Sequence, residues 1–585
     1  MRLVIAILAA LLTASLNQAA GPKLATELQN SASDSIVDVI VQYRRAPTES
    51  HHRRVLKRGG QLKRNLDIIR AAHYSVPAEE IEALSNDPDV EFISPDRAVF
   101  STATPVYAGN PDYGWRTAGA DLATSVFGVD GTGVGIAMID SGINDSDDLK
   151  DAMGHNRIVY KASLIPDISP DDSYGHGTHV SGILAGNGHK STGNGFDYLV
   201  RGIAPNAYLI SLLALNGKGV GTDSAVIAAI QQAISLKQQY NIRVMNLSLG
   251  RPVTESYLND PLCQAVQQAW QAGIVVVVAA GNEGRNNSLG TNGYGTITAP
   301  GNSPYVITVG AMNTVGTLTS TDDKIASYSS KGPTSIDHII KPDLVAPGNR
   351  VFSLNHGGSW LQKTYPGNGV AKLVYSTTTD TSAPDYYMLS GTSMAAPMVS
   401  GAAALMIQKD PSLTPDQVKA RLMKTASKFA PGYSTATDPV TGVTYTSEYD
   451  IFTIGAGYLN IPAALGNRDS HIGNAQSPTA TYYATTGNIY MAPTGTAAVW
   501  GTGADWGTAA VWGTAAVWGT SVFVNGTAAV WGTGAVWGTS VSWGSSVAWG
   551  TNTPHGFAAI WGTAAVWGSG QASGEATTTA ILGDN

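Results

Sequence analysis

The sequence predicts an α/β fold in which a doubly wound, mainly parallel sheet has helices on both faces. A small α+β unit is expected before this domain, and a repetitive β-type region is expected after it. Apolar runs rich in β-branched residues, such as VGIAMID, AYLISLLAL and GIVVVVAAGN, alternate between residues 134 and 312 with stretches long enough to form helices. Uninterrupted apolar strands are typical of a sheet buried on both faces, and their alternation with helices is typical of parallel strands.

The small N-terminal unit is expected over residues 36–100. Its pattern is the strand-like run SIVDVIVQY, a helical middle, a helix that starts at Pro77 and the strand-like run VEFISP. Proline at the start of a helix removes no hydrogen bond, which favours that helix start. A unit of roughly 65 residues is only marginally stable by itself.

The first 20 residues, MRLVIAILAALLTASLNQAA, combine one arginine, an apolar run and small residues near the end. This pattern is typical of a secretory signal peptide and is too short and too poorly flanked for a stable membrane span. We therefore expect a secreted or cell-surface protein.

Charge and cysteine content narrow the class of partner. The net charge is −8 and only 13% of the residues are charged, which excludes the basic footprint of nucleic-acid-binding or polybasic membrane-binding proteins. The single cysteine, Cys263, cannot form an intramolecular disulfide, and its helical context PLCQAVQQAW favours a small buried residue. The expected partner is a protein or a small molecule.

The region after Arg468 contains no lysine or arginine and carries ten of the thirteen tryptophans. They stand at positions 500, 506, 512, 518, 531, 537, 543, 549, 561 and 567, mostly six residues apart. Six is an even number, so an extended chain would present all of them on one face. Three interpretations remain open: a stacked β array, exposed aromatic rings that bind a polysaccharide or a cell surface, and a low-complexity tail.

Polar residues that follow the apolar runs are the first candidates for chemistry, because ligands of open parallel sheets bind beyond the carboxyl ends of the strands. Asp140 ends the run GIAMID, where a buried carboxylate needs a partner. His176 opens the helix-like stretch HGTHVSG and can be that partner, acting as a general base. A zinc site would need a third ligand or the H-E-x-x-H pattern, so we expect no metal there and treat His179 as structural.

Ser393, in the stretch LSGTSMAAPMVSG, is the expected nucleophile. Pro397 has no N–H group, so the helix should begin within about four residues before it and leave Ser393 near the positive N-terminal end. A serine that only caps this helix is the alternative. Asn282 follows the run VVVVAAG and is the expected amide donor to an oxyanion. In this interpretation Ser393 attacks, His176 transfers the proton and Asp140 orients the imidazole.

These motifs resemble those of the subtilisin-like serine peptidases, in which the order along the chain is Asp, His, Ser. The resemblance rests on AMIDSGI, GHGTHVSG, VMNLSLG, AAGNEG and GTSMAAPMVSGAAAL, with support from KPDLVAPG and GAGYLNIPAAL, and spans roughly residues 115–467. It implies a serine endopeptidase that needs no cofactor for catalysis and acts on proteins or peptides. It also implies residues that line the groove and the main side-chain pocket: Ser248, Leu249, Gly250, Ala279, Ala280 and Gly281.

The same resemblance implies an inhibitory propeptide that the enzyme cuts away somewhere between about Val99 and Tyr113. The implied division of the chain is a signal peptide (1–20), propeptide (21–103), peptidase domain (104–467), linker (468–495), tryptophan region (496–570) and tail (571–585). Two departures from the family stand out. The segment NGHKSTGNGFDYLVRG is unlike the calcium loop of many relatives, which puts that structural calcium in doubt, and residues 351–389 are expected to form an insertion near the groove.

Two other functions are alternatives to a secreted peptidase. An inactive peptidase-like adhesion or scaffold protein, acting through its tryptophan region, would have no need of all four polar residues. A lipase or esterase would be expected to show G-x-S-x-G, whereas Ser393 lies in the stretch Gly-Thr-Ser-Met-Ala.

Overall fold

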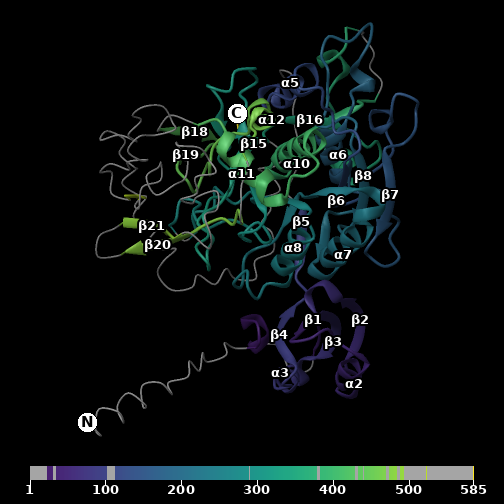
Figure 1. Ribbon diagram of the computed structural model, residues 1–585, viewed down its shortest axis with the longest axis vertical. Helices are drawn as coiled ribbons and strands as arrows, with labels where there is room; N and C mark the ends of the chain where they lie inside the picture. The colour runs from purple at the N-terminus through teal and green to yellow at the C-terminus, as the bar shows by residue number, and fades with distance from the viewer. Residues whose placement is uncertain are drawn as a thin grey trace. The chain divides into compact units, whose positions relative to one another are not determined.

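The computed structural model describes residues 23–30, 35–101, 112–288, 290–377, 383–428, 432–438, 441–469, 474–483, 488–492, 522–523 and 584. The predicted signal peptide lies outside these residues, and of the tryptophan region only residues 522–523 lie inside them. The chain divides into two compact units, Met1–Asp96 and Arg97–Asn585, which are described separately (Figure 1). Among the described residues, no helix has both the length and the apolar character needed to cross a membrane.

The first unit is a four-stranded antiparallel sheet in the order β2-β3-β1-β4 with two short helices. Val39, Val41, Tyr74 and Ile93 belong to its buried core. Its elements are β1 (Ile36–Tyr43), α2 (Glu49–Lys57), β2 (Gln61–Leu66), β3 (Ala71–Pro77), α3 (Ile81–Ser85) and β4 (Val90–Pro95).

The helical middle predicted for this unit is α-helical only over α2. Gly59 has a φ of 78°, and the N–H of Gly60 donates to the carbonyl of Val55 at 3.1 Å, a typical left-handed helix end. The chain then continues as β2, along which exposed and half-buried side chains alternate. The polar composition of QLKRNL gives no apolar alternation, which is why the pattern did not predict this strand.

The second unit contains the central sheet, in the order β14-β13-β12-β10-β6-β8-β7, with β15 also paired to β13. All of its pairings are parallel except that of β13 with β14. Every residue of β6 and β12 is buried, so the predicted doubly wound α/β fold is confirmed. The strands are β6 (Gly135–Asp140), β7 (Ile158–Ser163), β8 (Tyr208–Leu213), β10 (Ile242–Leu247), β12 (Val275–Ala279), β13 (Ile307–Asn313), β14 (Lys324–Ile325) and β15 (Leu344–Pro347).

Helices cover both faces of this sheet. In Figure 1, α6 and α10 lie on one side of β6, and α7 and α8 lie on the other. α10 packs on α6 and on β10, β12 and β13, whereas α7 packs on α8 and on β8. The helices are α4 (Gly114–Thr117), α5 (Ala120–Ser125), α6 (His176–Ala185), α7 (Asp223–Tyr240), α8 (Pro261–Gln271), α9 (Trp360–Thr364), α10 (Thr392–Lys409), α11 (Pro415–Thr425) and α12 (Ile461–Gly466).

Smaller sheets surround the central one. The order β11-β5-β9 forms a three-stranded antiparallel sheet, and β16 pairs with β17 at the two ends of the predicted insertion. These strands and the remaining ones are β5 (Ala98–Ser101), β9 (Val220–Thr222), β11 (Leu249–Gly250), β16 (Val351–Leu354), β17 (Tyr386–Leu389), β18 (Tyr433–Thr437), β19 (Thr444–Glu448), β20 (Thr479–Tyr483), β21 (Asn488–Ala492) and β22 (Val522–Phe523).

A buried group of charges ties the segment after α12 to this domain. Asp343 accepts from Nζ of Lys341 at 2.7 Å and lies 3.3 Å from Nζ of Lys419, and all three side chains are fully buried. The hydroxyl of Ser477 donates to the same carboxylate at 2.5 Å. Residues 474–480, which belong to the predicted linker, therefore contribute to the packing of the peptidase domain.

Candidate active site

Asp140 and His176 are brought together at the carboxyl edge of the central sheet. Asp140 is the last residue of β6, and His176 is the first residue of α6. Nδ1 of His176 lies 2.7 Å from Oδ1 of Asp140, and both side chains are at most 1% exposed. The carboxylate accepts a hydrogen bond from the N–H at Nδ1. In the neutral ring the lone pair is therefore on Nε2. Among the described residues Nε2 has no hydrogen-bond partner, which leaves it able to accept a proton.

Asp172 fixes the loop that leads into α6, a role that no sequence motif predicts. Burial raises the pKa of its carboxyl group, which makes hydrogen-bond donors necessary to keep it ionised. Ser141, the residue after Asp140, is one of them and in turn accepts from the N–H of Gly177 at 2.9 Å. The donors to Asp172 are the N–H groups of Tyr174, Gly175 and Thr178 and the hydroxyl groups of Ser141 and Thr178, at 2.6–3.1 Å.

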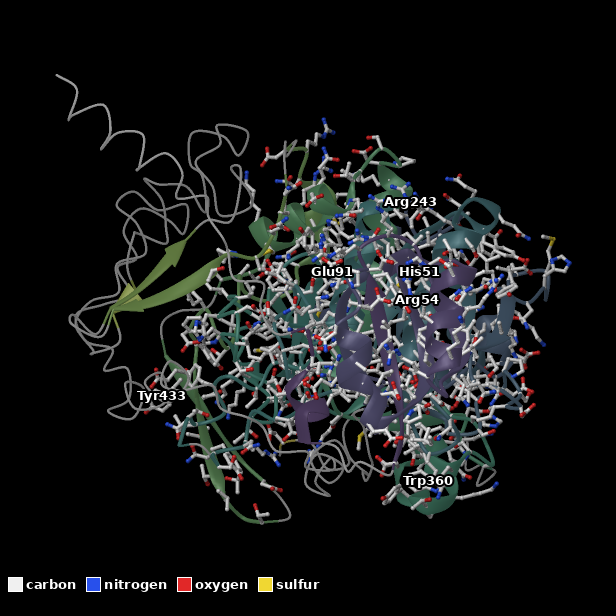
Figure 2. The ribbon with its side chains drawn as sticks, turned by 90° about the horizontal axis from the view of Figure 1, so that it is seen from below. His51, Arg54, Glu91, Arg243, Trp360 and Tyr433 are labelled. Carbon is white, nitrogen blue, oxygen red and sulfur yellow. The ribbon has the colours of Figure 1, made fainter. Side chains whose placement is uncertain are left out.

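The predicted insertion, residues 351–389, packs against this loop. The N–H of Trp360 donates to the carbonyl of Ser173 at 2.9 Å. The indole of Trp360, labelled in Figure 2, stacks on the ring of Tyr174 with 5.6 Å between centroids. The insertion therefore supports the loop in front of α6 through both backbone and aromatic contacts.

His179 lies one turn further along α6 and has a structural environment. Its Nε2 atom lies 2.9 Å from the carbonyl oxygen of Tyr387, and its own carbonyl accepts from the hydroxyl of Ser353 at 2.6 Å. Burial, together with the nearby His176, lowers the pKa of His179 to about 3, so the ring is neutral and links α6 to β16 and β17. The part of the chain that the structure describes contains no group of three or more His, Cys, Asp or Glu side chains suited to a metal ion.

Ser393 is the second residue of α10, which begins five residues before Pro397, close to the expected start within about four residues of that proline. Pro397 has no N–H to donate to the carbonyl of Ser393, and that carbonyl instead accepts from the hydroxyl of Ser248 at 2.8 Å. The hydroxyl of Ser393 in turn donates to the carbonyl of Ser248 at 3.1 Å. The proline inside the helix thus leaves the carbonyl of Ser393 free to accept the hydrogen bond from Ser248, the residue that follows β10.

Asn282 is held by the residue that precedes Ser393. Its side-chain oxygen accepts from the N–H of Thr392 at 2.9 Å and from the hydroxyl of Thr392 at 3.0 Å. The hydroxyl of Thr392 accepts from the N–H of Gly281 at 3.1 Å. Because the oxygen is fixed in this way, the orientation of the amide NH₂, the donor that an oxyanion needs, is fixed as well.

The predicted substrate-pairing residues Ser248, Leu249 and Gly250 follow β10, and the last two form β11. β11 pairs antiparallel with β5, so that Leu249 lies opposite Ser101 and Gly250 lies opposite Phe100. The other edge of β5 pairs with β9. An extended segment of the chain itself therefore lies between β11 and β9, where a bound peptide would add a strand.

The predicted pocket residues Ala279, Ala280 and Gly281 continue from the end of β12, and all three are buried. The carbonyl of Ala280 accepts from the N–H of Thr298 at 3.0 Å. Gly281 has a φ of 105°, and a Cβ there would come within 2.8 Å of Ser330 and Thr298. Glycine is therefore required at position 281.

Asp584 is a further neighbour of the Asn282 segment, and no sequence pattern predicts this contact. It accepts from Nη2 of Arg285, three residues after Asn282, at 2.7 Å. The N–H and hydroxyl of Ser327 donate to the same carboxylate at 2.6 and 2.7 Å. The side chain of Asn349 exchanges two further hydrogen bonds with the main chain of Asp584, which is fully buried. No periodicity or motif marks an aspartate near the end of a polar tail as a buried anchor.

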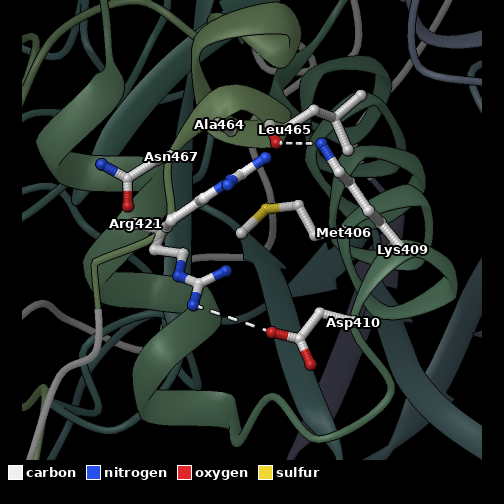
Figure 3. A pocket seen from close by; sticks show the side chains of 8 residues that line it. Met406, Lys409, Asp410, Arg421, Ala464, Leu465 and Asn467 are labelled. Atoms are coloured by element: carbon white, nitrogen blue, oxygen red, sulfur yellow. Dashed lines mark hydrogen bonds and ion pairs between the residues drawn. The ribbon is translucent and has the colours of Figure 1, made fainter.

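A cavity of about 250 Å³ lies at the opposite end of α10 (Figure 3). There Nζ of Lys409 donates to the carbonyl of Leu465 at 2.6 Å, and Arg421 lies 3.8 Å from Asp410. The 18 residues of α10 span about 27 Å, so this cavity is separate from the groups around Ser393. It is lined by Met406, Lys409, Asp410, Arg421, Ala464, Leu465, Asn467 and Arg468.

The region that contains these residues is similar in sequence to known proteins. The model of the Subtilase family matches residues 131–455, a range that includes Asp140, His176, Asn282 and Ser393. The chain is 38% identical over 309 residues to serine protease AprX of Bacillus subtilis, which is 51% of this chain but only 62% of that protein. It is 32% identical over 375 residues to subtilisin E of Bacillus subtilis, covering 64% of this chain and 80% of that protein. It is also 34% identical over 339 residues to subtilisin DY of Bacillus licheniformis, covering 58% of this chain and 92% of that protein.

Among solved structures, fervidolysin from Fervidobacterium pennivorans, described as a keratinolytic enzyme related to subtilisin, is similar in fold. The TM-score is 0.53 at 23% identity, over 74% of this chain and 61% of that one. The family match covers more than half of the chain and includes the four predicted catalytic positions. The chain belongs to the subtilase family of serine endopeptidases.

Proposed function

We propose that the protein is a secreted serine endopeptidase, made as a proenzyme that processes itself, with Ser393 as nucleophile. The observation that carries the proposal is the buried contact of 2.7 Å between His176 and Asp140, which leaves Nε2 of the imidazole as the acceptor. Membership of the subtilase family supports it. Secretion rests on the signal-peptide pattern of residues 1–20.

In the proposed mechanism the hydroxyl of Ser393 gives its proton to Nε2 of His176 as its oxygen bonds to the peptide carbonyl carbon. Since that hydroxyl donates to the carbonyl of Ser248, it must turn away from this acceptor before the attack. Asp140 stabilises the imidazolium, which then returns the proton to the leaving amine. The side-chain NH₂ of Asn282 and the N–H groups at the start of α10 stabilise the oxyanion. These groups supply nucleophile, base and oxyanion donors, so we propose that catalysis needs no cofactor.

We propose that substrates bind as an added strand along β11. Pairing through the backbone of Leu249 and Gly250 depends little on side-chain identity, which favours protein substrates of varied sequence. The position of β5 supports self-processing, because this segment of the chain already pairs with β11. Ser101, which lies opposite Leu249, is the last residue of β5. We propose cleavage after the next residue in the sequence, Thr102, or within two residues of it.

The test compares the wild type with Ser393→Ala and with Ser235→Ala, which removes an exposed hydroxyl on α7. Wild type and Ser235→Ala should react with a fluorophosphonate probe, cut casein and yield a mature chain that begins at or near Ala103 by mass spectrometry. Ser393→Ala should do none of these and should remain a full-length precursor after signal removal. Normal maturation of Ser393→Ala by the purified protein alone would rule out self-processing, and casein cleavage by it would rule out the nucleophile.

A further inference from the structure

Arg97, the residue directly before β5, is anchored on the peptidase domain by its side chain as well as its backbone. Its Nη1 atom lies 2.6 Å from Oε1 of Glu255, and the two side chains are only 10% and 8% exposed. Its carbonyl accepts from the N–H of Asp223 at 2.7 Å, next to the pairing of β5 with β9. The guanidinium of Arg97 therefore has a fixed position relative to β5, the strand that pairs with β11.

Glu255 belongs to a buried group in which carboxyl groups outnumber guanidinium groups. Arg251 binds Asp223 at 2.8 Å and Asp260 at 2.9 Å, and these three side chains are at most 1% exposed. With Arg97 in place the group holds two guanidinium groups against three carboxylates; without Arg97 one guanidinium would face all three. Burial raises the pKa of Glu255 to about 7, although the positive charge of Arg97 acts in the opposite direction. Oε2 of Glu255 is buried and makes no hydrogen bond to any described residue.

We infer that Glu255 forms a distal subsite that selects an arginine six residues before the cleaved bond, first in the chain itself and then in protein substrates. The inference rests on the proposed function, in which cleavage after Thr102 releases Arg97 together with the segment before it. The site that Arg97 leaves is a buried carboxyl group with a spare acceptor oxygen, in a group where carboxyl groups outnumber guanidinium groups. A guanidinium fits it better than an ammonium, because its planar fork of donors can reach both oxygens of one carboxylate.

The distance from the cleaved bond follows from the backbone. A substrate that pairs with β11 and β9 in the register of β5 places its sixth residue before the cleaved bond at the position of Arg97. Extended peptides keep this register because each residue advances by one ladder position. The subsite therefore selects the side chain at one position of the substrate, whereas the backbone pairing along β11 tolerates varied sequence.

The experiment uses the mature wild-type enzyme, Glu255→Gln and the matched control Asp121→Asn, which removes an exposed carboxylate on α5. The substrates are two internally quenched peptides with the sequence RAVFSTATPVYA, taken from residues 97–108, one with its arginine and one with glutamine in its place. Hydrogen bonds between charged groups predict that wild type and Asp121→Asn prefer the arginine peptide about 10- to 100-fold in kcat/KM, mostly through KM. Glu255→Gln should cleave the two peptides within about 2-fold of each other.

Equal kcat/KM values for the two peptides with the wild type would overturn the subsite while leaving the peptidase intact. A preference that survives in Glu255→Gln would assign it to another residue and would overturn the inference as well. If the fluorophosphonate probe does not label the protein, it is the proposed function that has failed. The two peptides are then compared by their binding affinity for the wild type. Tighter binding of the arginine peptide would still support the subsite, and equal affinities would overturn it.

Discussion

Replacing Lys341 by methionine should change how the stability of the folded protein depends on pH. Nζ of Lys341 is fully buried and donates to Asp343 at 2.7 Å and to the carbonyl of Val306 at 3.0 Å. Burial, reinforced by the nearby charge of Lys419, lowers the pKa of Lys341 from 10.5 to about 7 in spite of the Asp343 carboxylate. The folded protein therefore loses this proton near neutral pH, whereas the unfolded chain keeps it up to about pH 10.5.

The sign and the size of the effect follow from proton linkage. Between about pH 7 and 10.5 the unfolded chain binds one more proton than the folded protein, so this lysine makes the free energy of unfolding rise with pH. The slope is at most about 1.4 kcal/mol per pH unit, and the full change over 3.5 units is about 5 kcal/mol. Below pH 7, Lys341 lowers the free energy of unfolding by the full amount. This effect disappears above the pKa that the lysine has in the unfolded chain. Methionine keeps the volume of the side chain but removes the titration.

The assay is guanidinium unfolding of phenylmethanesulfonyl fluoride-inactivated enzyme at pH 7, 8, 9 and 10, followed by fluorescence. The free energy of unfolding of the wild type minus that of Lys341→Met should rise by about 1 kcal/mol per pH unit over this range. The difference between wild type and Lys324→Met, which removes an exposed lysine, should stay constant. A wild-type minus Lys341→Met difference that does not change with pH would refute the argument that Lys341 is deprotonated in the folded protein.

Three further predictions concern the site and its supports. Asn282→Ala should lower kcat on a chromogenic peptide about 10²–10³-fold with little change in KM, the cost that loss of the corresponding donor has in subtilisin itself; an unchanged kcat would remove Asn282 from the oxyanion site. Asp584→Ala should lower the free energy of unfolding by about 2 kcal/mol, because the buried N–H of Ser327 loses its acceptor, and an equal midpoint of guanidinium unfolding would contradict this. Trp360→Ala should lower kcat/KM about 3- to 10-fold by removing the stack on Tyr174, whereas Trp360→Phe should retain most of the activity.

The fold and the principal polar residues were predictable because their signals are local. Asp140 directly follows an uninterrupted apolar strand, and His176 stands at a glycine-rich helix start, so each position could be assigned from its neighbours in the chain. Functional groups of parallel sheets gather at the carboxyl edge, so the two residues could be expected to lie close together. The strand β2 could not be assigned, because QLKRNL lacks the alternation that identifies strands.

The supports of the site were not predictable for the opposite reason: their partners are remote in sequence. Arg285 binds Asp584, 299 residues further along the chain, and Arg97 binds Glu255, 158 residues away. Asp172 is closer, but its role depends on five donors whose directions are set by the folded loop. No spacing in one sequence identifies such pairs, since any buried acid can be satisfied by donors from any segment.

The anchoring of Asp584 has a consequence for how the protein would withstand proteolysis. Thr479 forms a β-bridge with Ile339, and Asp584 is bound by Arg285 and Ser327, so the peptidase domain holds the chain at both of these positions. One nick in the intervening stretch would produce two polypeptides that still migrate together in gel filtration and separate only in denaturant. The tryptophan-bearing stretch would then remain with the catalytic domain until a second nick, or the loss of this one carboxylate, set it free.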